Sequence, residues 1–219
     1  MKFAKIDFIN LLPFTVFIKK NIGSTQHQQI INYHKSYPSK INKKFKQRRI
    51  DAAFISSIKS KHENCSDLGI VADGEVLSVL ALSGEYEKDH QSDTSNILAK
   101  VLDIKGQVII GDKALYHYHN VPSKDFIDLA ETWKKRYGLP FVFARLCFNG
   151  NQKALCRLAK RFSNEKIFIP QYILKQYVQR SGLTAEQIKE YLKKINYKLG
   201  YKEKRALKLF FKLIKEKRL

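Results

Sequence analysis

Small polar residues stand at the ends of several apolar segments, each directly before a predicted helix. These residues are Asn10, Ser39, Ser56, Ser57, Thr94 and Ser95. Each of them could be a simple helix cap, which is the common role of these residue types. Helix N-termini also carry unpaired N–H groups and the positive end of the helix dipole, and both suit carboxylates or phosphates. Together, the six positions favour a binding site for a small anion.

Residue types that carry metal or thiol chemistry show no recognisable motif. His117 and His119 could form a pair of metal ligands, but two ligands without partners are too few for a zinc site, so we expect no metal. Cys65, Cys147 and Cys156 are odd in number and widely spaced, a pattern typical of neither a disulfide framework nor a zinc site. We expect reduced, mostly buried thiols. A catalytic cysteine stays open, because a histidine partner could meet it only in the fold.

The charge of the chain is strongly basic, with 41 Lys+Arg, 20 Asp+Glu and a net charge of +21. Residues 151–219 hold 19 Lys+Arg against 5 Asp+Glu, so most of the excess lies there. These lysines are scattered over helical segments without any recognition motif, which favours solvated helix faces over a specific nucleic-acid site. The same field would attract a small anionic substrate.

Strands alternate with helices along the chain, which predicts the α/β class. In open sheets of this class, ligands bind beyond the carboxyl ends of the strands. The run Asp51-Ala52-Ala53-Phe54-Ile55 is typical of a buried parallel strand, and the alternating Tyr116 and Tyr118 indicate a strand or loop. Strands are expected at 2–10, 51–55, on either side of the Asp73-Gly74 turn within 68–82, at 107–110 and within 139–148. Helices are expected from Pro13, 38, 92 and 128, and through most of the chain after 152, where Thr184 and Gln187 form a capping box.

Membrane insertion and export are not expected. No window approaches 18 uninterrupted apolar residues. The apolar stretch at the N-terminus is broken by Asp7 and Asn10, and no small-residue cleavage site follows it. We therefore expect a cytoplasmic protein.

An ordered series of motifs resembles the chorismate dehydratases of the futalosine route to menaquinone. The series covers nearly the whole chain, and its order is more specific than any single motif. It comprises Asn10-Leu11-Leu12-Pro13, residues 38–42, 51–58, 73–79, 92–95, 111–115, 128–130 with Trp133, 138–144, Tyr191-Leu192 and residues 197–200. Two departures are Arg145, where the family more often has an apolar residue, and the histidines 117 and 119, which fall in a variable loop.

The resemblance implies a two-lobed fold like that of type II periplasmic binding proteins. Two crossing strands near Leu77–Leu82 and Phe141–Phe148 would form the hinge. Lobe one would then comprise residues 1–79 plus 147–219, lobe two residues 80–146, and the ligand would lie in the cleft between them.

The resemblance also implies the chemistry, which is conversion of chorismate to 3-[(1-carboxyvinyl)oxy]benzoate and water without a metal or redox cofactor. Asn10 and Ser78 would orient the substrate beside its reacting carbons. The matched motifs contain no histidine, and their carboxylates have no evident role as a base, so the enolpyruvyl carboxylate of the substrate would itself take the proton. The residues expected to contact substrate are Ser39, Ser56, Ser57, Thr94, Ser95, Asp112 and Arg145.

Other readings stay open at this point. The first is the related enzyme of the same pathway that forms a dihydroxynaphthoate. The second is a non-catalytic protein that binds a small anion, and the third is a basic nucleic-acid binder. The motif order and the segment 138–144 favour the chorismate dehydratases.

Overall fold

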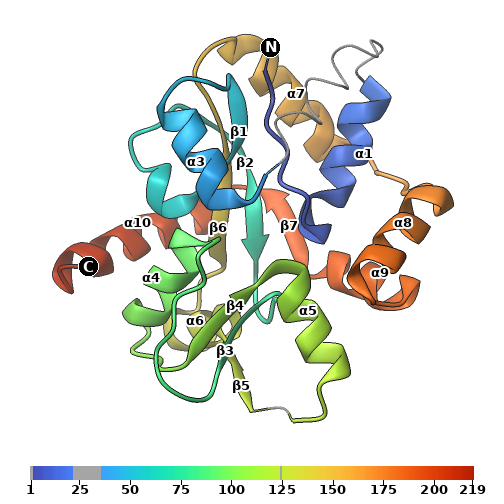
Figure 1. Cartoon of the computed structure of the whole chain (residues 1–219). Coiled ribbons are helices and arrows are strands. Elements are labelled where there is room, and N and C mark those ends of the chain that lie inside the picture. The colour runs from blue at the N-terminus through green and yellow to red at the C-terminus, as the bar shows by residue number, and fades with distance from the viewer. Residues whose placement is uncertain (1, 22–35, 124) are drawn as a thin grey trace.

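The residues that the computed structural model describes, 2–21, 36–123 and 125–219, form two β-sheets, one in each half of the molecule (Figure 1). The larger sheet has the strand order β1-β6-β2-β7 and the smaller one β4-β3-β5. The predicted α/β class and its two-lobed arrangement are confirmed. The strands are β1 (Ala52–Ser56), β2 (Cys65–Ala72), β3 (Val79–Leu82), β4 (Gln107–Ile110), β5 (Phe126–Asp128), β6 (Phe141–Phe148) and β7 (Ile195–Lys198).

Helices cover both sheets. In Figure 1, the helices α1, α3 and α7 lie around the larger sheet, and α4, α5 and α6 surround the smaller one. No described helix is both long and apolar enough to cross a membrane. The helices are α1 (Leu12–Asn21), α3 (Pro38–Lys46), α4 (Asp93–Val101), α5 (Gly111–Asn120), α6 (Leu129–Tyr137), α7 (Gln152–Asn164), α8 (Gln171–Ser181), α9 (Ala185–Lys193) and α10 (Tyr201–Glu216), with short 3₁₀ turns η1 (Ile9–Leu11) and η2 (Ser57–Lys59).

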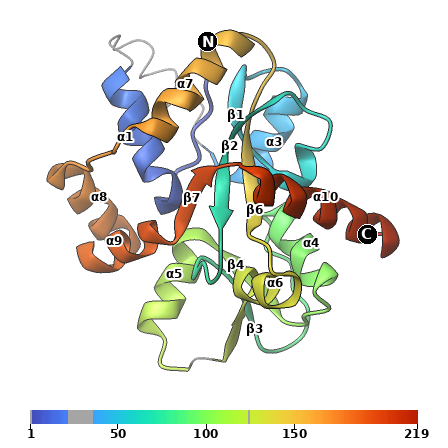
Figure 2. The ribbon, with the colours of Figure 1, turned by 180° about the vertical axis from the view of Figure 1, so that it is seen from behind.

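The back of the larger sheet is covered by α10, as the reverse view shows (Figure 2). Val71 and Val142 pair across β2 and β6 and pack against Leu207 of α10. Ile70 is next to Val71 on β2 and points to the opposite face, and a register shift between β2 and β6 at this point pairs it with Ala144. That opposite face borders the cleft described below.

Strand direction corrects one expectation from the sequence. Residues 51–55 were expected to form a parallel strand, but β1 pairs antiparallel with β6 over its whole length. Its parallel contact is a single bridge between Phe3 and Ala52, so the segment 2–10 is not the strand that was predicted. Every residue of β1 is buried. The continuous apolar run therefore reports burial on both faces rather than strand direction.

The cysteines also differ from expectation. Cys65 and Cys147 are opposite each other in the antiparallel pairing of β2 and β6, with Cα atoms 3.9 Å apart, and they form a disulfide. Cys156 is free but exposed rather than buried. The strand pairing brings together two residues that are 82 positions apart, and cysteine spacing alone does not reveal that pairing.

The sequence patterns did not predict some of the short elements. Tyr116 and Tyr118 lie in α5 rather than in a strand or loop, and β5 and β7 are too short to give a clear pattern. The division into lobes at 79/80 and 146/147 stays a prediction. Those two points lie within β3 and β6, whereas the chain passes between the sheets through residues 73–78 and 129–140.

Asp128 fixes the first of these connecting segments. One oxygen of its buried carboxylate accepts the backbone N–H groups of Val76 and Leu77, at 2.8 and 2.7 Å. The other accepts the N–H groups of Ala130 and Glu131, at 2.9 and 3.0 Å, and so caps α6. Leu77 has a φ of 59°, a conformation that a leucine rarely adopts, and these bonds hold it there. The next residue along the chain is Ser78.

Candidate active site

A cleft with a cavity volume of about 60 Å³ lies between the two sheets. Both halves of the molecule contribute to its walls, and apolar side chains form most of them. The lining residues are Ile6, Phe8, Asn10, Pro38, Ser56, Ile70, Val76, Ser78, Val79, Ser92, Ser95, Ile110, Gly111, Phe143 and Ala144. Asn10, Ser56, Ser78 and Ser95, all predicted site residues, are thus brought together.

Asn10 lies in the η1 turn and presents a polar atom that lacks a partner. Its Oδ1 is buried and accepts no hydrogen bond from any residue that the structure describes. The backbone carbonyl of Asn10 accepts a hydrogen bond from the Tyr197 hydroxyl at 2.6 Å, which fixes the turn. A buried polar atom without a partner is costly unless a ligand or water satisfies it. The position of this atom at the cleft makes a bound ligand its natural partner.

Ser78 is held by a second buried hydroxyl. Tyr191, on α9, donates to Ser78 Oγ at 2.9 Å. Burial raises the pKa of Tyr191, and interactions with Ser78 and Asn10 lower it by less. The phenol therefore stays neutral and can act as a donor at ordinary pH. Because Ser78 Oγ accepts from Tyr191, its own proton is available to a group in the cleft.

Ser56 has a similar arrangement with Asn42 of α3. The Asn42 amide nitrogen donates to Ser56 Oγ at 2.8 Å, and the Ser56 backbone N–H donates to Asn42 Oδ1 at 3.1 Å. Both residues are buried. The reciprocal pair fixes the serine rotamer and again leaves the hydroxyl proton of Ser56 for a ligand.

The far wall of the cleft is the N-terminus of α4. Ser92 is the N-cap, and its Oγ accepts the backbone N–H of Ser95 at 3.1 Å. Its hydroxyl also donates to Ser95 Oγ at 2.9 Å. Both hydroxyls lie at the positive end of a helix, where a carboxylate is favoured.

Three of the predicted site residues, Ser39, Ser57 and Thr94, do not line the cleft. Ser39 donates its hydroxyl to the His90 carbonyl at 3.0 Å, and Ser57 to the Val142 carbonyl at 2.6 Å. Thr94 accepts the Ile58 N–H at 3.3 Å. These hydroxyls already serve the backbone and tie neighbouring segments together. Their contact with substrate stays a prediction.

Arg145 and Asp112 are also outside the lining residues. Arg145 follows Ala144 on β6 but does not line the cleft, so the contacts of Arg145 and Asp112 with substrate stay predictions. Nη1 of Arg145 lies 3.5 Å from the Ser60 carbonyl, and burial lowers the pKa of Arg145. Asp112 accepts the Ile9 N–H at 3.0 Å, one residue before Asn10.

Three residues of the site had no assigned role in the sequence reading. Ser92 was recognised only as a capping residue, while Asn42 and Tyr191 fall within matched motifs without a stated role. Asn42 and Tyr191 donate to the hydroxyl oxygens of Ser56 and Ser78, from which they are 14 and 113 residues away in sequence. Such partners follow from tertiary packing, and no local pattern announces them.

The lining of the cleft carries no ionisable side chain among the described residues. Its polar groups are hydroxyls and one amide, and the rest is apolar. No group of three or more His, Cys, Asp or Glu side chains in the described ranges is arranged to hold a metal ion. The site can therefore orient and hydrogen-bond a ligand, but nothing in its lining can accept a proton as a conventional base at neutral pH.

Comparison with known protein sequences gives two matches. The family described as menaquinone biosynthesis matches residues 1–105 and 93–216. A chorismate dehydratase of Campylobacter jejuni subsp. jejuni is 46% identical over 220 residues, which covers 98% of each chain.

Comparison with solved structures supports the fold. A protein of Archaeoglobus fulgidus has a TM-score of 0.66 at 14% identity and covers 99% of this chain and 97% of its own. A structure described as an ABC transporter from Parabacteroides distasonis has a TM-score of 0.55 at 13% identity, with coverages of 99% and 92%. At these identities the likeness concerns the fold alone. These likenesses support the predicted α/β fold over nearly the whole chain.

Proposed function

We propose, from the premise that this chain belongs to the menaquinone-biosynthesis family, that it is a chorismate dehydratase. The reaction removes water from chorismate and gives 3-[(1-carboxyvinyl)oxy]benzoate. The enzyme is then a carbon–oxygen lyase acting on a small dianion. The hydrogen on the ether-bearing ring carbon is acidic because its carbanion delocalises into the ring carboxylate. Loss of the adjacent hydroxyl then makes the ring aromatic.

The observation that carries this proposal is a cleft with hydrogen-bonding groups but without an ionisable residue among its described lining. A protein base is absent from that lining, so the substrate's own enolpyruvyl carboxylate takes the ring proton. The C–O bond of the hydroxyl breaks next, and the departing hydroxide takes the proton from the enolpyruvyl carboxylic acid and leaves as water. The protein contributes orientation and electrostatic stabilisation, which are large terms in catalysis.

Asn10 and Ser78 are the residues that we assign to the reacting carbons. The unpartnered Oδ1 of Asn10 orients the substrate, and the Ser78 hydroxyl donates to the departing oxygen while Tyr191 donates to Ser78. The hydroxyls of Ser56 and Ser95 bind the carboxylates. Polar donors that are already fixed in place need no reorganisation during the reaction.

The wider setting fits a substrate of this charge. The net charge of +21 draws a dianion toward the cleft without a specific nucleic-acid site. We place the enzyme in the cytoplasm, and the reaction needs no metal or redox cofactor.

The direct test incubates the purified protein with chorismate in the presence of a chelator. Ultraviolet absorbance should report the new aromatic ring, and mass spectrometry should show a product lighter by one water. Chorismate left unchanged, or activity that the chelator abolishes and zinc restores, would contradict the proposal. Formation of a dihydroxynaphthoate from a later intermediate of the pathway would favour the related enzyme instead.

A further inference from the structure

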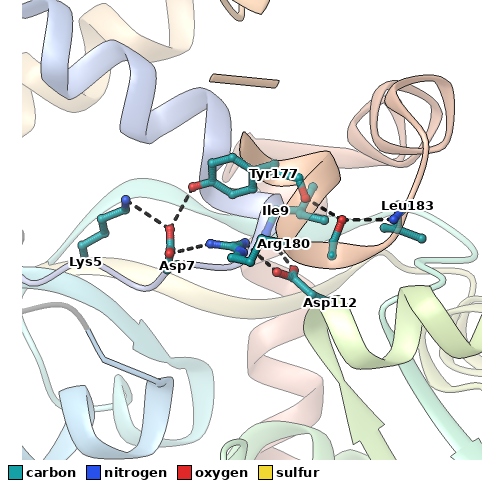
Figure 3. Close-up of polar contacts among 8 residues, drawn as sticks. Lys5, Asp7, Ile9, Asp112, Tyr177, Arg180 and Leu183 are labelled. Atoms are coloured by element: carbon teal, nitrogen blue, oxygen red, sulfur yellow. Dashed lines mark hydrogen bonds and ion pairs between the residues drawn. The ribbon is translucent and has the colours of Figure 1, made fainter. Parts of the chain in front are cut away.

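A polar network outside the cleft joins three segments that are far apart in the sequence (Figure 3). Arg180, on α8, donates from Nη1 to Asp7 and from Nη2 to Asp112 at 2.6 Å. Asp7 precedes the η1 turn, and Asp112 is in the first turn of α5. Tyr177 donates its hydroxyl to Asp7 at 2.9 Å, and its ring centroid lies 4.3 Å from the guanidinium carbon of Arg180. One arginine therefore ties the N-terminal segment to the smaller lobe.

The network reaches both proposed catalytic residues through their backbones. Asp112 Oδ1 accepts the N–H of Ile9, the neighbour of Asn10. Gly111 donates its N–H to the carbonyl of Ser78 at 2.8 Å. Two consecutive residues at the start of α5 thus hold the main chain on either side of the cleft.

The helix α5 packs closely against both the N-terminal segment and the end of α8. Gly111 has a φ of 64°, and a Cβ atom there would lie 2.9 Å from the ring of Phe8. Gly182, just after α8, has a φ of 70°, and a Cβ atom there would lie 3.0 Å from the ring of Tyr116 in α5. Only glycine permits both this conformation and this close approach.

We propose that Arg180 is a positioning residue for the dehydration: by holding Asp112 against the Ile9 amide, it fixes Asn10 relative to Ser78. The inference rests on the proposed function of the cleft. Arg180 does not line the cleft, so it acts through Asp112. The planar fork of an arginine can engage two carboxylates at once, and a lysine cannot reproduce that geometry.

The first test is kinetic. Arg180→Gln should lower kcat about ten- to a hundredfold and change KM less than about threefold, because small misplacements of catalytic groups act on the chemical step. Arg180→Lys should fall between this variant and the wild type. Arg136→Gln is the matched control, since Arg136 in α6 also faces a carboxylate, Asp103 at 3.8 Å, but is remote from the cleft. An unchanged kcat in the folded Arg180 variants would overturn the proposal.

A double-mutant cycle separates positioning from general damage. If Arg180 acts through Asn10, then Arg180→Gln should cause little further loss of kcat in an Asn10→Ala background. If the loss of kcat in the double variant equals the product of the two single losses, Arg180 acts independently of Asn10, and the inference is contradicted.

The last test needs no activity. Hydrogen exchange at the Ile9 amide should accelerate about tenfold in Arg180→Gln, or in Arg180→Lys if the former does not fold, and stay unchanged in Arg136→Gln. If the Ile9 amide exchanges equally slowly in the wild type and in the Arg180 variant, Arg180 does not hold the η1 turn, and the proposal is overturned. If the wild type does not convert chorismate, the proposed function fails, while this exchange measurement still decides whether Arg180 holds the turn.

Discussion

The hydroxyl of Tyr191 lies 2.9 Å from Oγ of Ser78, although 113 residues separate the two in sequence. Tyr191 is on α9, and Ser78 is the last residue of the segment 73–78 that connects the two sheets. Both side chains are buried, with 1% and 2% of their surface exposed. This contact fixes the orientation of a hydroxyl that lines the cleft, and its removal should affect catalysis more than stability.

Tyr191→Phe should lower kcat about three- to tenfold, because a neutral hydrogen bond contributes about 0.5–1.5 kcal/mol. The apolar ring is retained, so the melting temperature should change little. Tyr137→Phe, in α6 against Trp133, is the matched control and should leave kcat unchanged. Equal kcat values for the wild type and Tyr191→Phe would show that the contact with Ser78 has no part in turnover.

Three tyrosines should make the protein sensitive to alkali. Burial raises the pKa of Tyr177, Tyr191 and Tyr197 above the ordinary value of 10.0. Because the folded-state pKa exceeds the unfolded one, their stabilisation is complete below pH 10 and is lost as pH rises further. Each tyrosine should contribute a slope of about 1.4 kcal/mol per pH unit.

Urea unfolding between pH 9 and about 11 measures this slope. Tyr177→Phe should make the free energy of unfolding less dependent on pH above pH 10. The exposed Tyr201 provides the control, since Tyr201→Phe should leave the slope unchanged. A slope that is the same in the wild type and in Tyr177→Phe would mean that Tyr177 titrates alike in the folded and unfolded chains.

Asp128→Asn should destabilise the protein by about 2–4 kcal/mol. The carboxylate accepts four backbone N–H groups, and an amide replaces one acceptor oxygen with a donor that faces two of them. Each buried donor left without a partner costs about 1–3 kcal/mol. Asp73→Asn, at an exposed carboxylate, should change stability by less than about 1 kcal/mol. Equal unfolding midpoints for the two variants would exclude a structural role for the Asp128 carboxylate.

Local signals in the sequence predicted much of the helical structure. Pro13, Ser92, Thr184 and Gly138 mark helix ends correctly, because caps and positive-φ positions depend on a few neighbouring residues. The direction of β1 and the pairing of Cys65 with Cys147 could not be predicted, since both depend on which strands become neighbours.

The candidate site also contains residues that the sequence predicted and residues that it did not. The motif series placed Asn10 and Ser78 at the cleft, and the structure brings them to its lining. The partners that orient the site, Asn42, Tyr191 and Arg180, lie on helices whose packing no local pattern reveals. Arg145 does not line the cleft, and its contact with substrate stays a prediction.

Steady-state turnover of chorismate by Asn10→Ala, measured beside thermal unfolding of the same samples, decides whether Asn10 acts in the dehydration. Ser78→Ala is measured in parallel. If both residues act on the reacting carbons, kcat should fall about a hundred- to a thousandfold, because an oriented polar group is worth about 2.7–4 kcal/mol in the transition state. The melting temperatures should stay close to that of the wild type. A lowered melting temperature with near-normal turnover would contradict the account, because Asn10 would then serve the η1 turn alone.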